Sequence, residues 1–436
     1  MATVEAREAL LGDLVALSPK ANPGAAAAAL RAHAERALAS HRLPTIKDEP
    51  WRFTPLTSLL AHRYQAPGPA AAVLLPEVSR FLLPEAEGQR LVFVDGRFAP
   101  ALSSLAGTCP GLVLAPLSQL AALPAALGTL ADVESDAFTA LATHGLAEGA
   151  AVIVPEGLRC DRPVQLLFVS TGQAASYVVP RVLVAAGTGS AATVAQAFVC
   201  LAEGAYFVNA VTEVLAGDGA QVCHVRVQSE SREATHVERL VASLGRDAGY
   251  HLHSITLGGR LSRLDAVVRG REAGMDASLN GLALLAGEQE ADTHSSVVHA
   301  RPSCRSRQLH KMVLDDRAHA VFGGKIVVEP QAQQTDSAQA ARGLLLSDKA
   351  RIDAVPELKI DADDVKCGHG VAIGQIDGDQ LFYLKSRGID EPTARDLLTY
   401  AFAAEVIDQI PLASLRKQLQ AVVVGRTDRQ RREARP

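Results

Sequence analysis

The sequence has few aromatic residues and no paired cysteines. Aromatic residues make up 4% of the 436 residues, whereas 48% are hydrophobic and 34 are glycine. A chain of this length can bury a large core, and here the core must be built mainly from Ala, Val and Leu, which suits regular, tightly stacked backbone. The six cysteines form no CxxC pair, so we expect reduced thiols, and neither a zinc ribbon nor a disulfide framework.

Targeting, membrane and nucleotide-binding signals are also missing. The N-terminus has no apolar segment behind a basic start, and no uncharged apolar run is long enough to span a membrane. A formal charge of −5 gives no reason to expect nucleic acid or an anionic membrane as a partner. We find no Walker A loop, dinucleotide fingerprint or nucleophile elbow. We therefore expect a soluble, cytoplasmic protein that does not itself hydrolyse ATP.

The first part of the chain is mostly helical in pattern. Apolar residues recur at helical spacing over 4–17 and 24–40, and helical patterns return over 112–147. Asp95-Gly96 between apolar runs predicts a β-hairpin. Three prolines over 43–56 exclude a continuous helix there, and we expect Trp51 to anchor that segment rather than to form a ligand site. These patterns predict a helical domain with one short hairpin over residues 1–149.

Residues 150–386 have a different texture. Short β-type runs recur about every dozen residues, separated by turn signals such as Gly258-Gly259 and Gly323-Gly324. No long helical pattern interrupts them, which excludes βαβ units. An antiparallel sandwich or barrel and a parallel β-helix both remain; the number of strands, their even spacing and the few aromatics favour the β-helix, but the residues leave the choice open.

The C-terminal part returns to helix over 387–425. Asp390 is a suitable N-cap, and Pro411 separates two helices. An i, i+4 stripe runs along the first of them through Leu398, Phe402 and Val406. On residue patterns alone, we expect this helical pair to cover the end of the β-region and so to block edge pairing. The tail, 426–436, carries five arginines and is expected to be disordered.

Cys367 and His369 lie two residues apart in a β-type run, so both side chains would face the same side of a strand. A thiolate with an imidazole suits iron, copper, zinc or an iron–sulfur cluster, but two donors cannot complete a coordination sphere. On residue types alone, a small core cysteine beside an edge histidine is the favoured interpretation. Two further histidine pairs are weaker candidates for metal sites: His251 with His253, and His294 with His299. Cys200, Cys223 and Cys304 are expected to be inert small hydrophobic residues.

A family resemblance favours a functional role for Cys367 and His369. The runs Ala362–Gly370 and Leu381–Ile389, together with the stretch from His299 to Ile360, resemble the SufB/SufD family, scaffold proteins of the bacterial SUF iron–sulfur assembly system, and within it the SufD type. The segment around Trp51 is similar as well. Gly368 departs from the pattern, which has Ser there. The resemblance implies a mainly β fold, a right-handed parallel β-helix flanked by N- and C-terminal helical domains.

The resemblance also implies a function. The chain would be a non-enzymatic scaffold subunit that pairs with SufB through the C-terminal end of its β-helix and binds the ATPase SufC through its C-terminal helices, with Leu398, Phe402 and Val406 at that contact. A transient iron–sulfur cluster would form at the SufB–SufD interface, with His369 as ligand or proton carrier and Cys367 of lesser weight. Reduced flavin in the complex and a homodimer in isolation stay open. The alternatives are a SufB-type subunit and a β-helix carbohydrate enzyme.

Overall fold

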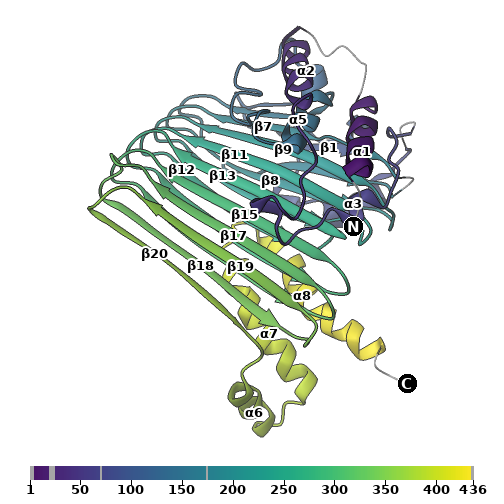
Figure 1. Cartoon of the computed structure of the whole chain (residues 1–436), viewed down its shortest axis with the longest axis vertical. Helices are drawn as coiled ribbons and strands as arrows, with labels where there is room; N and C mark the ends of the chain where they lie inside the picture. Colours follow the sequence, from purple (N-terminus) through teal and green to yellow (C-terminus); the bar gives the residue numbers. More distant parts are fainter. Residues whose placement is uncertain (1–3, 19–24, 69–70, 173–174, 434–436) are drawn as a thin grey trace.

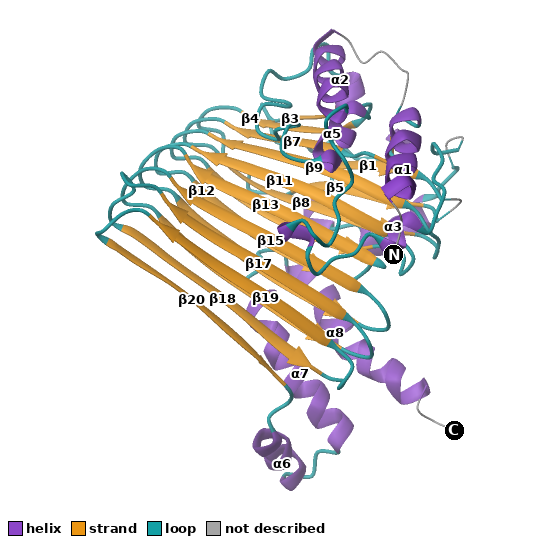
Figure 2. Cartoon of the chain, viewed as in Figure 1, coloured by secondary structure: helices purple, strands orange, loops and turns teal. Residues whose placement is uncertain are grey.

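Two layers of strands run the length of the molecule and enclose a narrow interior (Figure 2). The computed structural model describes residues 4–18, 25–68, 71–172 and 175–433. Sheet I has the strand order β2 (Arg97–Phe98), β1 (Arg90–Val94), β5 (Val164–Ser170), β8 (Ala191–Cys200), β10 (Gln221–Ser229), β12 (Gly249–Thr256), β14 (Asp276–Leu285), β16 (Arg305–Leu314), β18 (Thr335–Leu345), β20 (Val365–Gly374).

Sheet II interleaves with it along the chain. Its order is β19 (Arg351–Ile360), β17 (His319–Val328), β15 (Glu290–His299), β13 (Leu261–Gly270), β11 (Thr235–Leu244), β9 (Phe207–Ala216), β7 (Arg181–Ala186), β4 (Gly149–Val154), β3 (Val113–Pro116), with β6 (Tyr177–Val178) beside β9. From β4 and β5 onward each described strand pairs in parallel with the next strand of its own sheet, while the chain alternates between the sheets. The predicted parallel β-helix is therefore confirmed, and the antiparallel sandwich is excluded.

The corners of the β-helix depend on a left-handed backbone conformation. Gly189, Gly219 and Gly287 lie at corners with φ of 66°, 68° and 66°, where a residue without a Cβ carries little strain. Asp247 and Asp316 take the same role with φ of 53° each, as short polar side chains tolerate this region best. The turn predicted at Gly258-Gly259 is confirmed between β12 and β13, where Gly259 has a φ of 86°. The turn predicted at Gly323-Gly324 is wrong, because both glycines lie inside β17.

Helices cover the outer face of each sheet (Figure 1). On sheet II lie α1 (Val4–Ala16), α2 (Ala25–Leu38) and α5 (Ala137–His144), which share an apolar cluster with side chains of β9, β11 and β13. On sheet I lie α7 (Glu391–Ile407) and α8 (Ala413–Glu433), while α6 (Gly378–Ser386) projects away from it. Short helices fill the N-terminal part: η1 (Glu49–Trp51), α3 (Thr57–Leu60), α4 (Leu75–Val78), η2 (Ser79–Phe81), η3 (Pro84–Ala86), η4 (Pro100–Leu102), η5 (Leu117–Gln119).

Three expectations about the boundaries differ from the structure. The helical pair α7–α8 lies across the face of sheet I and does not cover the end of the β-helix, because its apolar stripe packs on residues of β8 to β18. The β-helix ends at Gly374, so the predicted boundary at 386 falls at the end of α6, and β1 already joins sheet I from within the predicted N-terminal domain. The tail expected to be disordered continues α8 as far as Glu433; residues 434–436 lie outside the described residues.

The proline-rich segment around Trp51 is fastened to sheet II, as predicted. Trp51 is 9% exposed, and the guanidinium carbon of Arg263 lies 3.9 Å from its ring centroid. The centroid of the Phe138 ring lies 5.3 Å from that of Trp51. Thr54 donates a hydrogen bond of 2.6 Å to Asp292, which also pairs with Arg263. A cation–π contact and a buried ion pair therefore anchor this segment.

Candidate functional site

The C-terminal end of the β-helix is open. β19 and β20 are the last strands of their sheets, and each pairs on one side only within the described chain. Figure 1 shows both strands along the free end, with no helix laid over them. Both are ten residues long. Unpaired strands of this length present a row of free backbone donors and acceptors that another chain can use. We call the open end formed by β19 and β20, together with the interior positions next to them, the mouth.

One row of side chains on β20 lines the mouth. Cys367 and His369 are in register with Ser337 and Gln339 of β18, whose side chains are buried inside the β-helix. Residues two apart face the same side of a strand, so Cys367 and His369 both face the interior at its open end. The predicted shared orientation of these two side chains is confirmed.

Exposed apolar side chains continue this row. Val371 and Ile373 follow on β20 with 41% and 42% exposed, and Ile360 at the end of β19 is 37% exposed. The β20 residues face the same side as His369 because they keep its alternation. Val371 and Ile373 lie toward the end of β20 that faces the start of β19, and Ile360 lies at the other end of the mouth. Large apolar side chains open to water along the edge of two strands are typical of a protein contact surface.

His369 is exposed, whereas Cys367 is half-buried. Burial raises the pKa of the Cys367 thiol above its ordinary value. Cys367 packs beside an apolar cluster built around Ile326 and Val328 of β17, across the interior. Of the two donors, the His369 imidazole is therefore the more accessible, and the thiol pays a desolvation penalty for ionising.

A hydroxyl column lies behind Cys367. His299 is fully buried, and its Nε2 lies 2.9 Å from the Ser306 hydroxyl, which in turn lies 2.6 Å from the Ser337 hydroxyl. Ser337 is the residue in register with Cys367. Burial lowers the pKa of His299 to about 4, so its ring is neutral near pH 7.

An amide column lies behind His369. Gln308 and Gln339 are both 3% exposed and stand in register with each other and with His369. Ser295 donates a hydrogen bond of 2.7 Å to Gln308. Among the described residues, neither amide atom of Gln339 has a hydrogen-bond partner. Its side chain reaches across the interior to sheet II, where a Cβ at Gly324 would collide with it.

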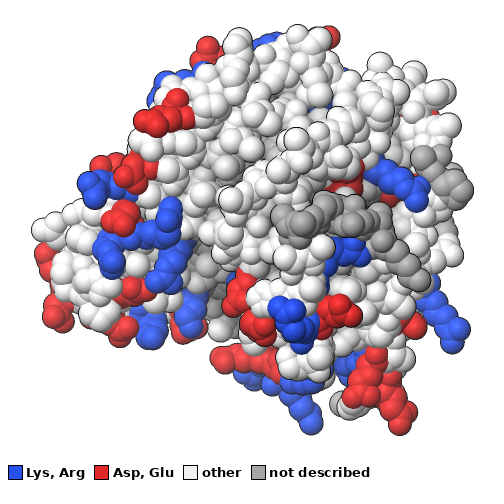
Figure 3. Space-filling view, turned by 90° about the horizontal axis from the view of Figure 1, so that it is seen from above, with Lys and Arg blue, Asp and Glu red and all other residues white. Residues whose placement is uncertain are grey.

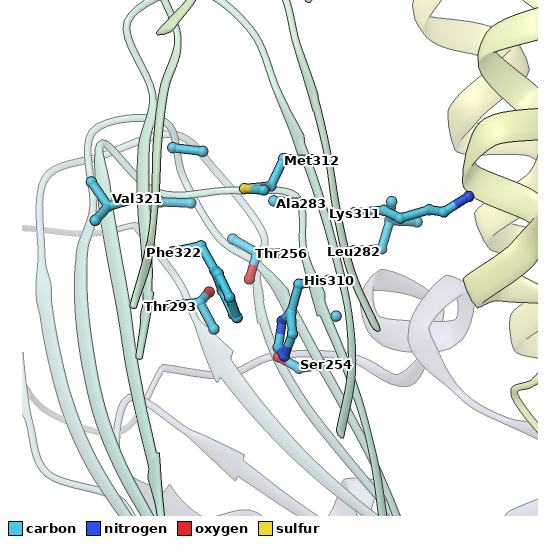
Figure 4. A pocket seen from close by; sticks show the side chains of 13 residues that line it. Ser254, Thr256, Leu282, Ala283, Thr293, His310, Lys311, Met312, Val321 and Phe322 are labelled. Atoms are coloured by element: carbon cyan, nitrogen blue, oxygen red, sulfur yellow. The ribbon is translucent and has the colours of Figure 1, made fainter. Parts of the chain in front are cut away.

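Further inside, the β-helix holds a small cavity of about 20 Å³ (Figure 4). His310, Phe322 and Thr293 point into it, whereas Lys311 points outward toward the helices. Burial lowers the pKa of His310 to about 3, and its Nε2 has no hydrogen-bond partner in the described chain. This volume is near that of a single water, so the interior is not an open tunnel at this level.

A group of buried charges lies near the middle of the β-helix. Arg226, His236 and Glu238 are fully buried, and Glu238 pairs with both of the others. Burial alone would raise the pKa of Glu238, but the charges of Arg226 and His236 lower it to about 2. His236 also pairs with Glu230 at 2.7 Å, and its pKa is raised. Because these partners satisfy one another, the group is structural.

The predicted partner-binding stripe packs on the chain itself. Val406 is fully buried against sheet I, and Phe402 is partly buried with its ring 4.4 Å from the ammonium of Lys311. Leu398 is half-buried. The Phe402 and Val406 part of the stripe thus belongs to the contact between α7 and the β-helix. The role of Leu398, Phe402 and Val406 in binding a partner stays a prediction. The side chains that the C-terminal helices leave exposed belong to other residues.

The weaker metal candidates do not form coordination sites. Within the described part of the chain no three His, Cys, Asp or Glu side chains come together as metal ligands. His251 lies 2.9 Å from the Ser278 hydroxyl, and His253 is buried with its pKa lowered to about 4. His294 pairs with Asp292. All six cysteines are free thiols: Cys109, Cys160, Cys200, Cys223, Cys304 and Cys367.

The surface offers no single-sign patch on the face drawn in Figure 3. Lys and Arg mix with Asp and Glu around the outline of this face, and its middle is largely uncharged. Binding to nucleic acid needs a coherent positive surface, which this face does not present. None of the described helices is long and apolar enough to cross a membrane.

Residue patterns did not identify Gln339, Val371 and Ile373 as parts of the mouth. Two signals were available in the sequence. The apolar alternation continues past His369 to Val371 and Ile373, and positions 308, 339 and 369 recur at the length of one coil. The second signal becomes visible only when the coil length is known.

Comparison with known proteins agrees with this geometry. Residues 168–402 match the SUF system FeS cluster assembly SufBD core domain, and residues 20–166 match the SufBD protein N-terminal region. An iron-sulfur cluster assembly SufBD family protein of Synechocystis sp. is 38% identical over 89% of this chain and 89% of its own length. The iron-sulfur cluster assembly protein SufD of Escherichia coli is 33% identical over 87% of this chain and 88% of its own length.

A plant relative extends the range. The chloroplastic protein ABCI7 of Arabidopsis thaliana is 32% identical over 91% of this chain and 85% of its own length. Both family models and these relatives cover nearly the whole chain, including the mouth and most of α7. Hence the carbohydrate-enzyme alternative is set aside: the chain belongs to the SufBD family of SUF iron–sulfur cluster assembly proteins and is homologous to SufD.

Proposed function

We propose that this chain is a non-enzymatic scaffold subunit of a SUF assembly complex, and that a nascent iron–sulfur cluster forms at its mouth against a SufB subunit. The observation that carries this proposal is the incomplete donor set at an unfinished edge. Cys367 and His369 face one spot, no third ligand from the described chain joins them, and the strand that presents them is unpaired on its outer side.

The proposed contact with SufB continues both sheets. A partner with a similar open end would pair its last strands with β19 and β20 and would bury Ile360, Val371 and Ile373. It would also place its own donors opposite His369. In the absence of SufB, a second copy of this chain presents the same edges, which would account for a homodimer.

The cluster is the cargo of this reaction rather than a resident cofactor. A neutral imidazole nitrogen is an acceptable iron ligand, and a thiolate is the usual ligand of iron–sulfur clusters. His369 is the more exposed of the two groups, so we assign it the larger share. Burial raises the pKa of Cys367, which makes its thiolate harder to form before a metal is present.

The ATPase subunit SufC is proposed to dock on the exposed part of the C-terminal helices. Phe382 and Tyr383 on α6 are 73% and 56% exposed, and Leu397 on α7 is 46% exposed. These residues, unlike Val406, are free of the β-helix. Replacing Phe382 and Tyr383 by Ala should abolish co-purification with SufC at unchanged thermal stability, whereas retention of SufC would place its docking site elsewhere.

The central test replaces His369 by Ala in the complete complex. We expect loss of cluster formation, read as iron and sulfide on the purified complex and as failure to rescue a strain that lacks the gene. Complex assembly should persist because the proposed contact with SufB is made by the strand edges and by the apolar side chains of Ile360, Val371 and Ile373. Cys367→Ala should cost less, and exposed His33→Ala is the matched control. Full rescue by His369→Ala would contradict the proposed function.

A further inference from the structure

Gln339 is buried at the mouth, and its amide makes no hydrogen bond within the described chain. Its side chain is 3% exposed, yet both amide atoms lack a partner within the described residues. A buried amide without hydrogen bonds costs about 1–3 kcal/mol. A Leu of similar size would avoid that cost, so the amide has a purpose that packing does not explain.

The backbone around Gln339 is shaped to admit the amide. Gly324 of β17 lies opposite it across the interior, and any side chain there would occupy the space of the Gln339 amide. Gln308, one coil further inside, accepts a hydrogen bond from Ser295 and has a free Nε2. The column therefore presents amide groups that step toward the open end.

His369 is the next residue of this column. It is in register with Gln339 on the neighbouring strand, and adjacent strands lie about 4.8 Å apart. Both side chains face the interior side, and exposed His369 can turn about its side-chain bonds without moving the backbone. An amide oxygen has two lone pairs, so that of Gln339 can accept from Gln308 and from an imidazole N–H together.

We infer that Gln339 is a positioning residue for His369: its amide oxygen accepts the Nδ1–H of the imidazole and leaves the Nε2 lone pair directed out of the mouth. A hydrogen bond at one ring nitrogen decides which nitrogen is free to bind a metal. The inference rests on the proposed function of His369 and adds a residue and a tautomer that the function requires.

The test reads the tautomer of His369 by ¹⁵N NMR of the full chain without iron, at a pH where the ring is neutral, with His369→Ala identifying the signal. We expect the Nδ1–H form in the wild type and its loss in Gln339→Leu. Gln339→Glu, which keeps an acceptor oxygen, should retain it. Gln228→Leu, at a buried glutamine of β10 away from the mouth, is the matched control and should leave the tautomer unchanged.

Two outcomes overturn the inference: an Nε2–H majority in the wild type, or the same tautomer ratio in Gln339→Leu as in the wild type. The first decides the matter even if Gln339→Leu does not fold. The result is independent of cluster formation. If His369→Ala still supports cluster assembly while the tautomer depends on Gln339, the proposed function is wrong and the positioning contact is correct. If His369→Ala abolishes cluster assembly while the tautomer does not depend on Gln339, the proposed function is supported and the positioning contact is wrong.

Discussion

The two ends of the β-helix are finished in different ways. At the N-terminal end the outermost strands are short, with β2 two residues and β3 four residues long, and β3 ends at Pro116. At the C-terminal end β19 and β20 are each ten residues long and unpaired on their outer sides in the described chain. Short strands and proline are devices that prevent edge pairing, so the first end is closed to other chains and the second is left available.

The side chains inside the β-helix also differ between its two ends. Near the N-terminal end Phe93, Phe168 and Phe198 stack in register with ring centroids 4.9 Å and 5.0 Å apart. Near the mouth the interior positions of β16 and β18 include Ser306, Gln308, Ser337 and Gln339, in register with Cys367 and His369 of β20, opposite apolar residues of β17. Apolar stacking stabilises a fold that needs no partner, whereas polar interior groups at an open end contribute little until another chain covers them.

The largest expected effect lies between the two ends, in the buried charges. Glu238→Gln should lower the free energy of unfolding by about 4 kcal/mol, because it leaves Arg226 and His236 buried without their shared counter-charge. Urea denaturation measures this. Replacing Arg226 by Met and Glu238 by Leu together should recover much of the loss, and a double variant as unstable as the single one would contradict the explanation.

The aromatic stack comes next. Phe168→Ala should destabilise the chain by about 3 kcal/mol through the cavity it leaves between Phe93 and Phe198. Val371→Ala at the mouth should change stability by less than about 0.5 kcal/mol, since its side chain is already exposed. Equal losses from the two substitutions, measured by the same denaturation series, would show that the ends do not differ as described.

Acid should weaken the fold through its buried histidines. Burial lowers the pKa of His224, His253 and His299 to about 4 and that of His310 to about 3, below the ordinary value of about 6.5. The unfolded chain therefore binds protons that the folded chain does not, and the stability present above pH 6.5 is lost as the pH falls toward 4. Each such histidine contributes about 1.4 kcal/mol per pH unit in that window.

His299→Gln removes one of these protons and should reduce the slope of stability against pH accordingly. Replacing exposed His33 by Gln should leave the slope unchanged. Denaturation midpoints between pH 4 and pH 7 provide the measurement. A slope that stays the same in His299→Gln would mean that His299 is already protonated in the folded chain.

A double substitution at the mouth should have a small effect on stability and a large effect on assembly. Changing Val371 and Ile373 together to Asp should alter the free energy of unfolding by less than about 1 kcal/mol, because both side chains are exposed. The pair should nevertheless abolish co-purification with SufB. Val113→Asp, at an exposed position on β3 of the closed end, is the matched control. Loss of SufB with the control but not with the pair would reverse the assignment of the ends.

Much of the local structure could be predicted from residue patterns. Helical spacing located α1 and α2, and Asp95-Gly96 marked the hairpin between β1 and β2, where both residues have positive φ. The pair Cys367 and His369 was found because strand alternation alone places such residues on one face. These features depend on interactions between residues close in sequence, which the sequence displays directly.

Other features depended on pairings between distant residues, and only the tertiary structure decided them. The choice between an antiparallel sandwich and a parallel β-helix is a choice of partners one coil apart, and the column that brings Gln339 beside His369 exists only once that register is set. The stripe through Phe402 and Val406 has the same periodicity whether it packs on its own sheet or on another chain. The structure shows that Phe402 and Val406 pack on β8 to β18. An apolar helix face in a sequence indicates that the face is buried, but it does not indicate which surface buries it.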